Sequence, residues 1–163
     1  MADQRTVVTG LLPCAAVVLT VAAGERHDAM TATAVFVSED PPLLSVSVGE
    51  HLLTHDLIEQ AGEFVVNLVT PEQHEMVRRV GSTHGRDVDK FDQFSIATEP
   101  SERVGAPRLA GSYACLECEV VSSYQASTYR VYTAEVVAHS ADESRSPLVW
   151  HRGRYFRLGT PVG

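Results

Sequence analysis

The sequence is poor in cysteine and in long apolar runs, and each shortage excludes a class of protein. Three cysteines in 163 residues are an odd and sparse set, which disfavours a disulfide framework and suits a reducing compartment. The longest apolar stretch, Leu11 to Ala23, is interrupted by Pro13 and Thr20 and is shorter than the roughly 20 residues of a membrane-spanning helix. The first residues carry no pattern of a secretory signal or a lipid attachment site. We therefore expect a cytoplasmic protein that does not enter a membrane.

Positive charge is also scarce. The chain has 13 Lys and Arg against 21 Asp and Glu, a net charge of −8, which disfavours binding to nucleic acid or anionic lipid. Its 44% hydrophobic and 21% charged residues are typical of a globular protein. No repeat or Pro/Gly/Ser-rich linker divides the sequence. We expect a single domain over residues 1–163.

Segments of strand length recur along the chain. An apolar, valine-rich run from Ala15 to Val21 predicts a buried strand, and Met30 to Ser38 is expected to pair with it as the second arm of a hairpin. Leu44, Val46 and Val48 alternate with serines, which indicates a strand with one face in the core. Further strands are expected at Phe64 to Val69, Tyr113 to Tyr124, Thr128 to His139 and Arg154 to Leu158.

Two short helices are expected between these strands. Thr54 is a candidate N-cap for a helix through Gln60, and Gly62 would end it. Pro71 suits a first helical position, and this second helix would run to about Val80. Residues 81–92 are polar and are expected to form a loop. Because strands and helices do not alternate as βαβ units, the sequence predicts a mainly β fold, a barrel of six or seven largely antiparallel strands with short helices at its ends.

Sequence motifs of several enzyme classes are absent. The chain has no dinucleotide-binding glycine fingerprint, no phosphate-binding Walker loop, no serine-hydrolase elbow and no zinc-protease helix motif. Cys115 and Cys118 have the spacing of a zinc knuckle, but three positions along a strand place the thiols on opposite faces. His51 and His55 form at most an incomplete site. We expect no metal centre.

One group of residues favours binding of an anion. His51 and Thr54 lie where a helix N-terminus would offer free N–H groups to a phosphate, although a solvated pair of histidines is the simpler reading of His51 and His55. The loop that follows the second helix adds Arg86 and Lys90, the only lysine of the chain. The alternative is that Lys90 pairs on the surface with Asp87 or Asp89.

Four fragments in order resemble one family. They are Asp28 to Thr33, Pro41-Pro42-Leu43 leading into a Leu-Ser-Val-Ser-Val strand, Gly62 to Asn67, and Asp89-Lys90-Phe91. Their order and spacing resemble the flavin reductase-like family of FMN-binding split-barrel proteins, over roughly Leu11 to Leu158. The resemblance implies a six-stranded split barrel that forms a homodimer and binds FMN close to the subunit interface, with FAD as the alternative flavin.

The resemblance also implies which residues bind the cofactor. A strand edge would meet the polar rim of the flavin ring through its backbone groups, and a cluster of donors would hold the phosphate. Phe91 is expected either to cover the ring or to attach its loop to the core, and Tyr155 either to approach the ring or to belong to a final core strand. The expected cofactor-binding residues are Thr31, Ala32, Thr33, Ala34, Gly49, His51, Thr54, Arg86, Lys90, Phe91 and Tyr155.

The implied activity is an NAD(P)H-dependent flavin reductase, with NADH or NADPH as electron donor and a separate monooxygenase as a candidate recipient of reduced flavin. Many such family members carry a Gly-Asp-His turn before the late strand, whereas this chain has Gln125-Ala126-Ser127-Thr128-Tyr129 there. We therefore assign no catalytic residue. The alternatives are an electron carrier that binds FMN without being an enzyme and a split-barrel module that binds no flavin.

Overall fold

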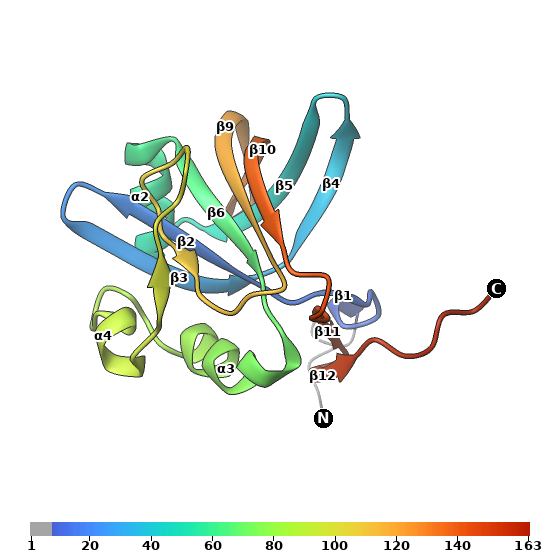
Figure 1. Ribbon diagram of the computed structural model, residues 1–163. Coiled ribbons are helices and arrows are strands. Elements are labelled where there is room, and N and C mark those ends of the chain that lie inside the picture. The colour runs from blue at the N-terminus through green and yellow to red at the C-terminus, as the bar shows by residue number, and fades with distance from the viewer. Residues whose placement is uncertain (1–7) are drawn as a thin grey trace.

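The computed structural model describes residues 8–163 and is built mainly from β-strands (Figure 1). The expectation that the chain starts without a secretory signal or a lipid attachment site rests on Met1 to Arg5, which lie outside this range. The helical segments are α2 (Leu53–Ala61), η1 (Pro71–Gln73), α3 (His74–Ser82) and α4 (Lys90–Phe94). The strands are β1 (Cys14–Ala15), β2 (Val17–Ala23), β3 (Arg26–Ala32), β4 (Ala34–Glu39), β5 (Pro42–Gly49), β6 (Glu63–Leu68), β7 (Thr98–Glu99), β8 (Arg108–Leu109), β9 (Ala114–Ala126), β10 (Tyr129–Ala141), β11 (Leu148–His151) and β12 (Arg154–Arg157).

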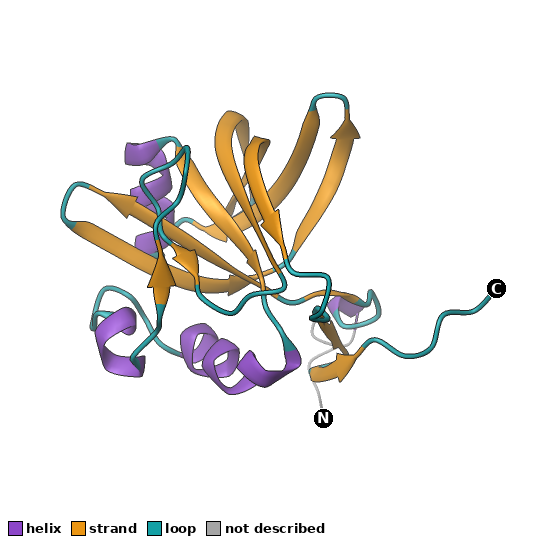
Figure 2. Ribbon diagram, in the orientation of Figure 1, coloured by secondary structure: helices purple, strands orange, loops and turns teal. Residues whose placement is uncertain are grey.

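Seven strands form one sheet in the order β3-β2-β6-β9-β10-β5-β4, and each neighbouring pair is antiparallel. Figure 2 shows this sheet, in orange, with α2 at its upper left and with α3 and α4 below β2 and β3. β1, β11 and β12 form a small separate sheet near the C-terminal end. The predicted mainly β, largely antiparallel fold is confirmed.

The inner face of the sheet encloses the main hydrophobic core. Leu19 on β2 and Val46 on β5 belong to the same buried cluster, although three strands separate β2 from β5 in the sheet. The sheet must therefore curl so that its two ends face each other. Leu57 and Ile58 of α2 complete this core. The predicted alternation in β5 is confirmed, because Leu44, Val46 and Val48 are all buried.

The outer face of β2 and β3 is covered by α3 and α4. Val18 and Ala29 of the two strands pack in one cluster with Val77 and Val80 of α3 and with Phe91 of α4. β2 is thus buried on both faces, which explains why its sequence is an almost continuous apolar run. Within residues 8–163, no helix is long and apolar enough to cross a membrane.

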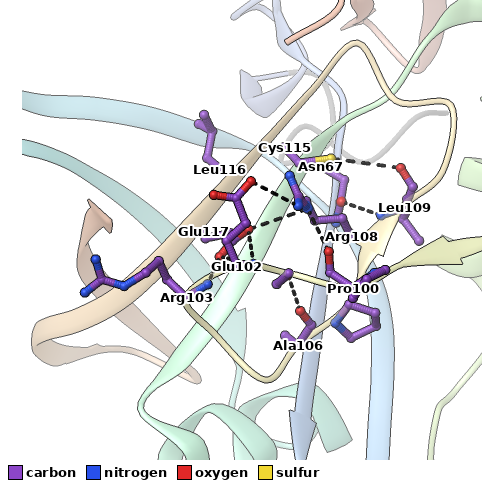
Figure 3. A network of polar contacts seen from close by, with 12 residues as sticks. Asn67, Pro100, Glu102, Arg103, Ala106, Arg108, Leu109, Cys115, Leu116 and Glu117 are labelled. Carbon is purple, nitrogen blue, oxygen red and sulfur yellow. Dashed lines mark hydrogen bonds and ion pairs between the residues drawn. The ribbon is translucent and has the colours of Figure 1, made fainter. Parts of the chain in front are cut away.

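A loop over the outer face of β6 and β9 is held by a buried carboxylate (Figure 3). Glu117 of β9 has no solvent exposure and accepts hydrogen bonds from the backbone N–H groups of Glu102, at 2.9 Å, and Arg103, at 2.6 Å. The Arg108 guanidinium lies 3.5 Å from the same carboxylate. Cys115, which faces this side of β9, packs under the loop. The carboxylate and the thiol are therefore both buried on the face that the alternation of β9 places opposite the main core.

The two thiols of β9 lie on opposite faces, as the spacing predicts. Cys118 packs in the main core, and Cys115 packs with Val65, Val104 and Ala106 beneath the loop. The two long strands β9 and β10 form the predicted hairpin, and Gly62 ends α2 in the left-handed conformation with φ of 70°.

The structure corrects three sequence-based predictions of local structure. Met30 to Ser38 is not one hairpin arm, because the strand is interrupted at Thr33: β3 pairs with β2, and β4 pairs with β5 instead. Thr54 is not an N-cap; α2 begins after Leu52 without a side-chain cap. The loop predicted at 81–92 is shorter, because α3 runs to Ser82 and α4 begins at Lys90, with the carboxylate of Asp89 accepting the N–H groups of Phe91 and Asp92.

Candidate functional site

A cavity of about 390 Å³ opens at the end of β3, and we call it the edge cavity. It gathers four residues that the sequence analysis assigned to a cofactor site, Thr31, Ala32, Thr33 and Tyr155. Its volume lies within the range of small-molecule sites, about 300–1,000 Å³. The other lining residues, which the sequence analysis did not identify, are Ala16, Met30, Ser47, Tyr129 and Trp150.

The edge cavity lies beside an unpaired strand edge. β3 is the last strand of the seven-stranded sheet and pairs only with β2, so within the described chain the backbone groups on its other side have no strand partner. The pairing then stops at Thr33, which is exposed between β3 and β4. Because Ala32 and the two threonines are small, a flat ligand can approach these backbone N–H and C=O groups closely.

The hydroxyl of Thr31 is used to position α3. It donates a hydrogen bond to the carbonyl of Val77 at 2.7 Å. A Cβ on Gly81, one turn further along α3, would lie only 3.1 Å from the same hydroxyl oxygen. Helix and strand are therefore packed as closely as a glycine allows, and Thr31 offers a ligand its backbone rather than its hydroxyl.

Two aromatic residues form the wall of the edge cavity. Trp150 of β11 and Tyr155 of β12 are direct cross-strand partners. Both also line a second cavity of about 500 Å³, together with Thr31 and the polar side chains of α3. We call this the arginine cavity, after Arg78 and Arg79. Burial raises the pKa of the Tyr155 phenol, and the charge of Arg78 opposes that rise.

Two predicted phosphate-binding residues meet at a buried carboxylate instead of facing solvent. Thr54 Oγ1 donates to Asp28 Oδ2 at 2.6 Å, and Lys90 Nζ lies 3.1 Å from Asp28 Oδ1 and donates to the carbonyl of Ala29 at 2.5 Å. The side chains of Lys90 and Asp28 are 4% and 3% exposed. The alternative of a surface pair with Asp87 or Asp89 is therefore wrong.

The space around this carboxylate is tight. A Cβ on Gly85 would clash with the Asp28 carboxylate, so only glycine fits at that position. Asp89 takes a different partner from the one expected, since its carboxylate lies 2.8 Å from His27 Nε2. The loop between α3 and α4 is thus fixed at several points next to Lys90.

Arg86 holds the turn that leads into α2. It donates to the carbonyl of His51 at 3.0 Å and to Asp56 at 2.7 Å. The hydrogen bond from Arg86 is the main cause that lowers the pKa of Asp56, with His55 as a second cause. Arg86 and Leu53 also line a third cavity, of about 530 Å³, that we call the loop cavity. We call the contacts of Arg86 with His51 and Asp56 the Arg86 clamp. The first N–H groups of α2 have no partner within the helix, and they lie next to the Arg86 clamp.

The remaining predicted residues are placed as follows. Gly49 ends β5 opposite Tyr129, and a Cβ there would lie 2.9 Å from the His51 ring. Ala34 begins β4 and is half-buried. Phe91 is 9% exposed, packs in the outer cluster and meets the His27 ring edge-on at 4.7 Å, which favours attachment of its loop to the core over covering a ring.

Some site residues carried no recognisable signal in the sequence. Tyr129 is the first residue of β10, directly after a turn that contains no histidine, and it reaches the edge cavity because β10 pairs with β5. Trp150 is the only tryptophan of the sequence, and no motif around it indicates a binding site. Among residues 8–163, no three or more His, Cys, Asp or Glu side chains gather closely enough to hold a metal ion.

The curled antiparallel sheet with an aromatic-walled cavity at its edge defines a small β protein with room for a small-molecule ligand, and comparison with known sequences gives its family. The family model described as "Flavin reductase like domain" matches residues 9–159. The chain therefore belongs to the flavin reductase-like family. It is 33% identical to the "NADH-dependent FMN reductase AsuE2" of Streptomyces nodosus subsp. asukaensis, over 93% of this chain and 82% of that protein.

Two further proteins are similar over most of the chain. The reductase component of a 4-nitrophenol 4-monooxygenase/4-nitrocatechol 2-monooxygenase from Rhodococcus opacus is 29% identical, covering 94% of this chain and 79% of its own. The structure of the NADH:FAD oxidoreductase SgcE6 of Streptomyces globisporus superimposes with a TM-score of 0.88 at 27% identity, covering 98% of this chain and 95% of its own. SgcE6 has also been solved in complex with NAD and FAD fragments, with a TM-score of 0.87 at 27% identity, over 98% of this chain and 93% of its own.

Proposed function

We propose that the protein is a flavin reductase that uses a nicotinamide nucleotide to reduce FMN or FAD. The observation that carries the proposal is the edge cavity, in which an unpaired strand edge with small side chains faces the aromatic pair Trp150 and Tyr155. An isoalloxazine ring is flat, apolar on its faces and polar along its rim, so it fits such a cavity. The names of the relatives from Streptomyces nodosus and Streptomyces globisporus support the same function.

In this proposal the protein binds and orients the flavin and the nicotinamide nucleotide. The flavin, when bound, supplies the redox chemistry by accepting a hydride from the reduced nicotinamide. The backbone N–H groups of residues 31–34 that the sheet leaves unpaired would donate to the rim of the ring and would favour the negative charge that reduction places there. Trp150 and Tyr155 exclude water from one side of the cavity. Within the described chain no histidine lines this cavity, so the phenols of Tyr129 and Tyr155 are its titratable groups.

We assign the flavin phosphate to the N-terminal turn of α2. The unpaired N–H groups of this turn favour an anion, and Arg86 brings a positive charge to the same turn through its contacts with the carbonyls of His51 and Leu52. Gly49 and His51 shape the turn that precedes the helix. Thr54 and Lys90 would act indirectly, since both are bound to Asp28 and thereby connect α2 and α4 to β3.

The decisive experiment is an anaerobic titration of the purified, FMN-loaded protein. Loss of the flavin absorbance near 450 nm on addition of NADH or NADPH is the result expected of a reductase. A yellow protein that neither nucleotide bleaches would be the electron carrier, an alternative that the missing histidine at the β9–β10 turn favours. A protein that takes up no added FMN or FAD would overturn both functions.

We also propose that the protein forms a homodimer through its β4 edge. β4 is the last strand of the sheet, and Val35, Phe36 and Val37 are 62%, 56% and 55% exposed. Exposed apolar edge strands pair or associate unless they are covered. Light scattering on the intact protein tests this, with Phe36→Lys expected to give a monomer. A monomeric parent protein would overturn it.

We propose three further properties of the protein: the recipient of its reduced flavin, its single-domain organisation and its location in the cell. A separate monooxygenase as the recipient of reduced flavin is supported by the relative from Rhodococcus opacus, which is named as a reductase component. A single domain that closes as a split barrel is supported by the packing of core clusters on both faces of one sheet. A cytoplasmic location is supported by three free cysteines and is tested by cell fractionation.

A further inference from the structure

The arginine cavity adjoins the edge cavity and differs from it in chemistry. The two cavities share Thr31, Trp150 and Tyr155, whereas the loop cavity shares no lining residue with either. A ligand longer than a flavin ring can therefore continue from the edge cavity past the aromatic pair into the arginine cavity. A nicotinamide dinucleotide has this length, with a flat ring at one end and two phosphates and an adenosine behind it.

The polar side of the arginine cavity is a three-residue ion cluster on α3. Glu75 Oε2 lies 3.2 Å from an Nη of Arg78, and Glu75 Oε1 lies 3.2 Å from Nε of Arg79. Residues at positions i, i+3 and i+4 share one face of a helix, and all three line the cavity. Their side chains are 51%, 65% and 57% exposed, so a ligand can reach each of them.

The cluster keeps unused donors and acceptors. Each arginine has five N–H donors, and a carboxylate can accept about four hydrogen bonds. Each arginine donates one hydrogen bond to Glu75. The arginines therefore suit a diphosphate, and Glu75 suits a diol, because a carboxylate accepts from hydroxyl groups and repels a further phosphate.

We propose that Glu75 selects NADH over NADPH by binding the adenosine ribose, while Arg78 and Arg79 bind the diphosphate. The two donors differ only at the ribose 2′-position, which is a hydroxyl in NADH and a phosphate in NADPH. An acidic residue at that position favours the hydroxyl, as in other nicotinamide-binding proteins. The inference rests on the proposed reductase function and adds to it the group that distinguishes the two electron donors.

The position of the cluster is set by close packing rather than by a flexible loop. Thr31 binds the carbonyl of Val77, and Gly81 approaches Thr31 so closely that a Cβ would lie 3.1 Å from its hydroxyl. Val77 and Val80 are buried against the sheet, and Val77 lines the cavity next to the ion cluster. The cluster is therefore held in a fixed place relative to β3, which borders the edge cavity.

The test compares Glu75→Gln with a matched control. Glu72→Gln removes a carboxylate of similar exposure, 67%, that pairs with Arg157 at 2.9 Å and does not line the cavity. We expect kcat/KM to favour NADH in the parent protein. In Glu75→Gln we expect the ratio of kcat/KM for NADH to kcat/KM for NADPH to fall by about tenfold, mainly through a lower KM for NADPH. Glu72→Gln should keep the parent ratio.

Binding of the oxidised nucleotides gives a readout without turnover. Calorimetry on the FMN-loaded protein should show tighter binding of NADP⁺ to Glu75→Gln than to the parent. The double variant Arg78→Gln/Arg79→Gln should bind both NAD⁺ and NADP⁺ more weakly, with FMN affinity unchanged. An unchanged NADH preference in Glu75→Gln would overturn the proposal, as would loss of FMN affinity in the double variant, which would assign the cluster to the flavin.

Failure of the role proposed for Glu75 can be distinguished from failure of the proposed reductase function. If neither nucleotide reduces bound FMN in the parent protein, the reductase function fails and the inference fails with it. If NADH reduces the flavin and Glu75→Gln leaves the preference intact, the reductase function stands and the role of Glu75 alone is wrong.

Discussion

Lys90 and Asp28 form an ion pair that is almost fully buried, with Lys90 Nζ 3.1 Å from Asp28 Oδ1. The hydroxyl of Thr54 donates to the other carboxylate oxygen at 2.6 Å. One aspartate of β3 therefore joins α2 and α4, the helices that border the proposed phosphate site. The only lysine of the chain is part of the scaffold of the site, where the sequence pattern suggested a direct ligand.

Removing the lysine should destabilise the fold strongly. Lys90→Met leaves the Asp28 carboxylate buried with no cation, which costs about 3–5 kcal/mol. Urea unfolding of the variant and the parent measures this difference. The double variant Asp28→Asn/Lys90→Met removes both charges and should regain most of the loss. Equal stability of Lys90→Met and the parent would show that the pair is not closed in solution.

Filling the edge cavity should block flavin binding without unfolding the protein. Ala32→Leu adds a larger side chain where the ring would approach the strand edge, and we expect the Kd for FMN to rise by about 10- to 100-fold, equal to about 1–3 kcal/mol. Quenching of FMN fluorescence gives the Kd. Ala97→Leu, at an exposed alanine that lines none of the three cavities, is the control and should bind FMN normally. Normal binding by Ala32→Leu would place the ring elsewhere.

The loop over β6 and β9 should loosen when its carboxylate is neutralised. In Glu117→Gln an amide NH₂ faces backbone N–H donors of Glu102 and Arg103, and we expect the free energy of unfolding to fall by about 1.5–3 kcal/mol. Hydrogen exchange should become faster in residues 100–109 and stay unchanged in β10. Glu119→Gln, an exposed position on the same strand, is the control. Unchanged exchange in the loop would contradict a role for Glu117 in holding it.

The Arg86 clamp should be visible in the titration of Asp56. The hydrogen bond from Arg86 lowers the pKa of Asp56 below its ordinary value of 3.8. A lowered folded-state pKa gives stability that is present above the unfolded value and is lost as the pH falls through the folded value. Arg86→Gln should therefore raise the Asp56 pKa toward 3.8 and make the acid-induced loss of stability less steep. Carboxyl-carbon NMR measures the pKa, and an unchanged midpoint would show that the clamp is open in solution.

The features that could be predicted from the sequence are those set by neighbouring residues. The alternation of Leu44, Val46 and Val48, the end of α2 at Gly62 and the long hairpin of β9 and β10 all follow from local side-chain patterns and turn residues. Thr31, Ala32 and Thr33, which the resemblance assigns to a flavin site, all line the edge cavity.

The features that could not be predicted depend on partners far apart in the chain. Asp28 and Lys90 are 62 positions apart, and nothing near either residue identifies the other as its partner. Trp150 enters the edge cavity through its pairing with Tyr155 and through the small sheet that β1 completes. Thr54 looked like a helix cap because threonine favours that position, but a buried carboxylate on another element is a stronger partner for its hydroxyl.

The burial of the three thiols affects how readily peroxide oxidises the protein. Reduced flavin that escapes into aerated water yields hydrogen peroxide, which attacks thiolates much faster than thiols. Burial raises the pKa of Cys118 to about 12, and burial raises the pKa of Cys14 and Cys115 as well. Burial therefore disfavours the reactive thiolate form at all three sulfurs, which slows their reaction with the peroxide that the proposed chemistry would release.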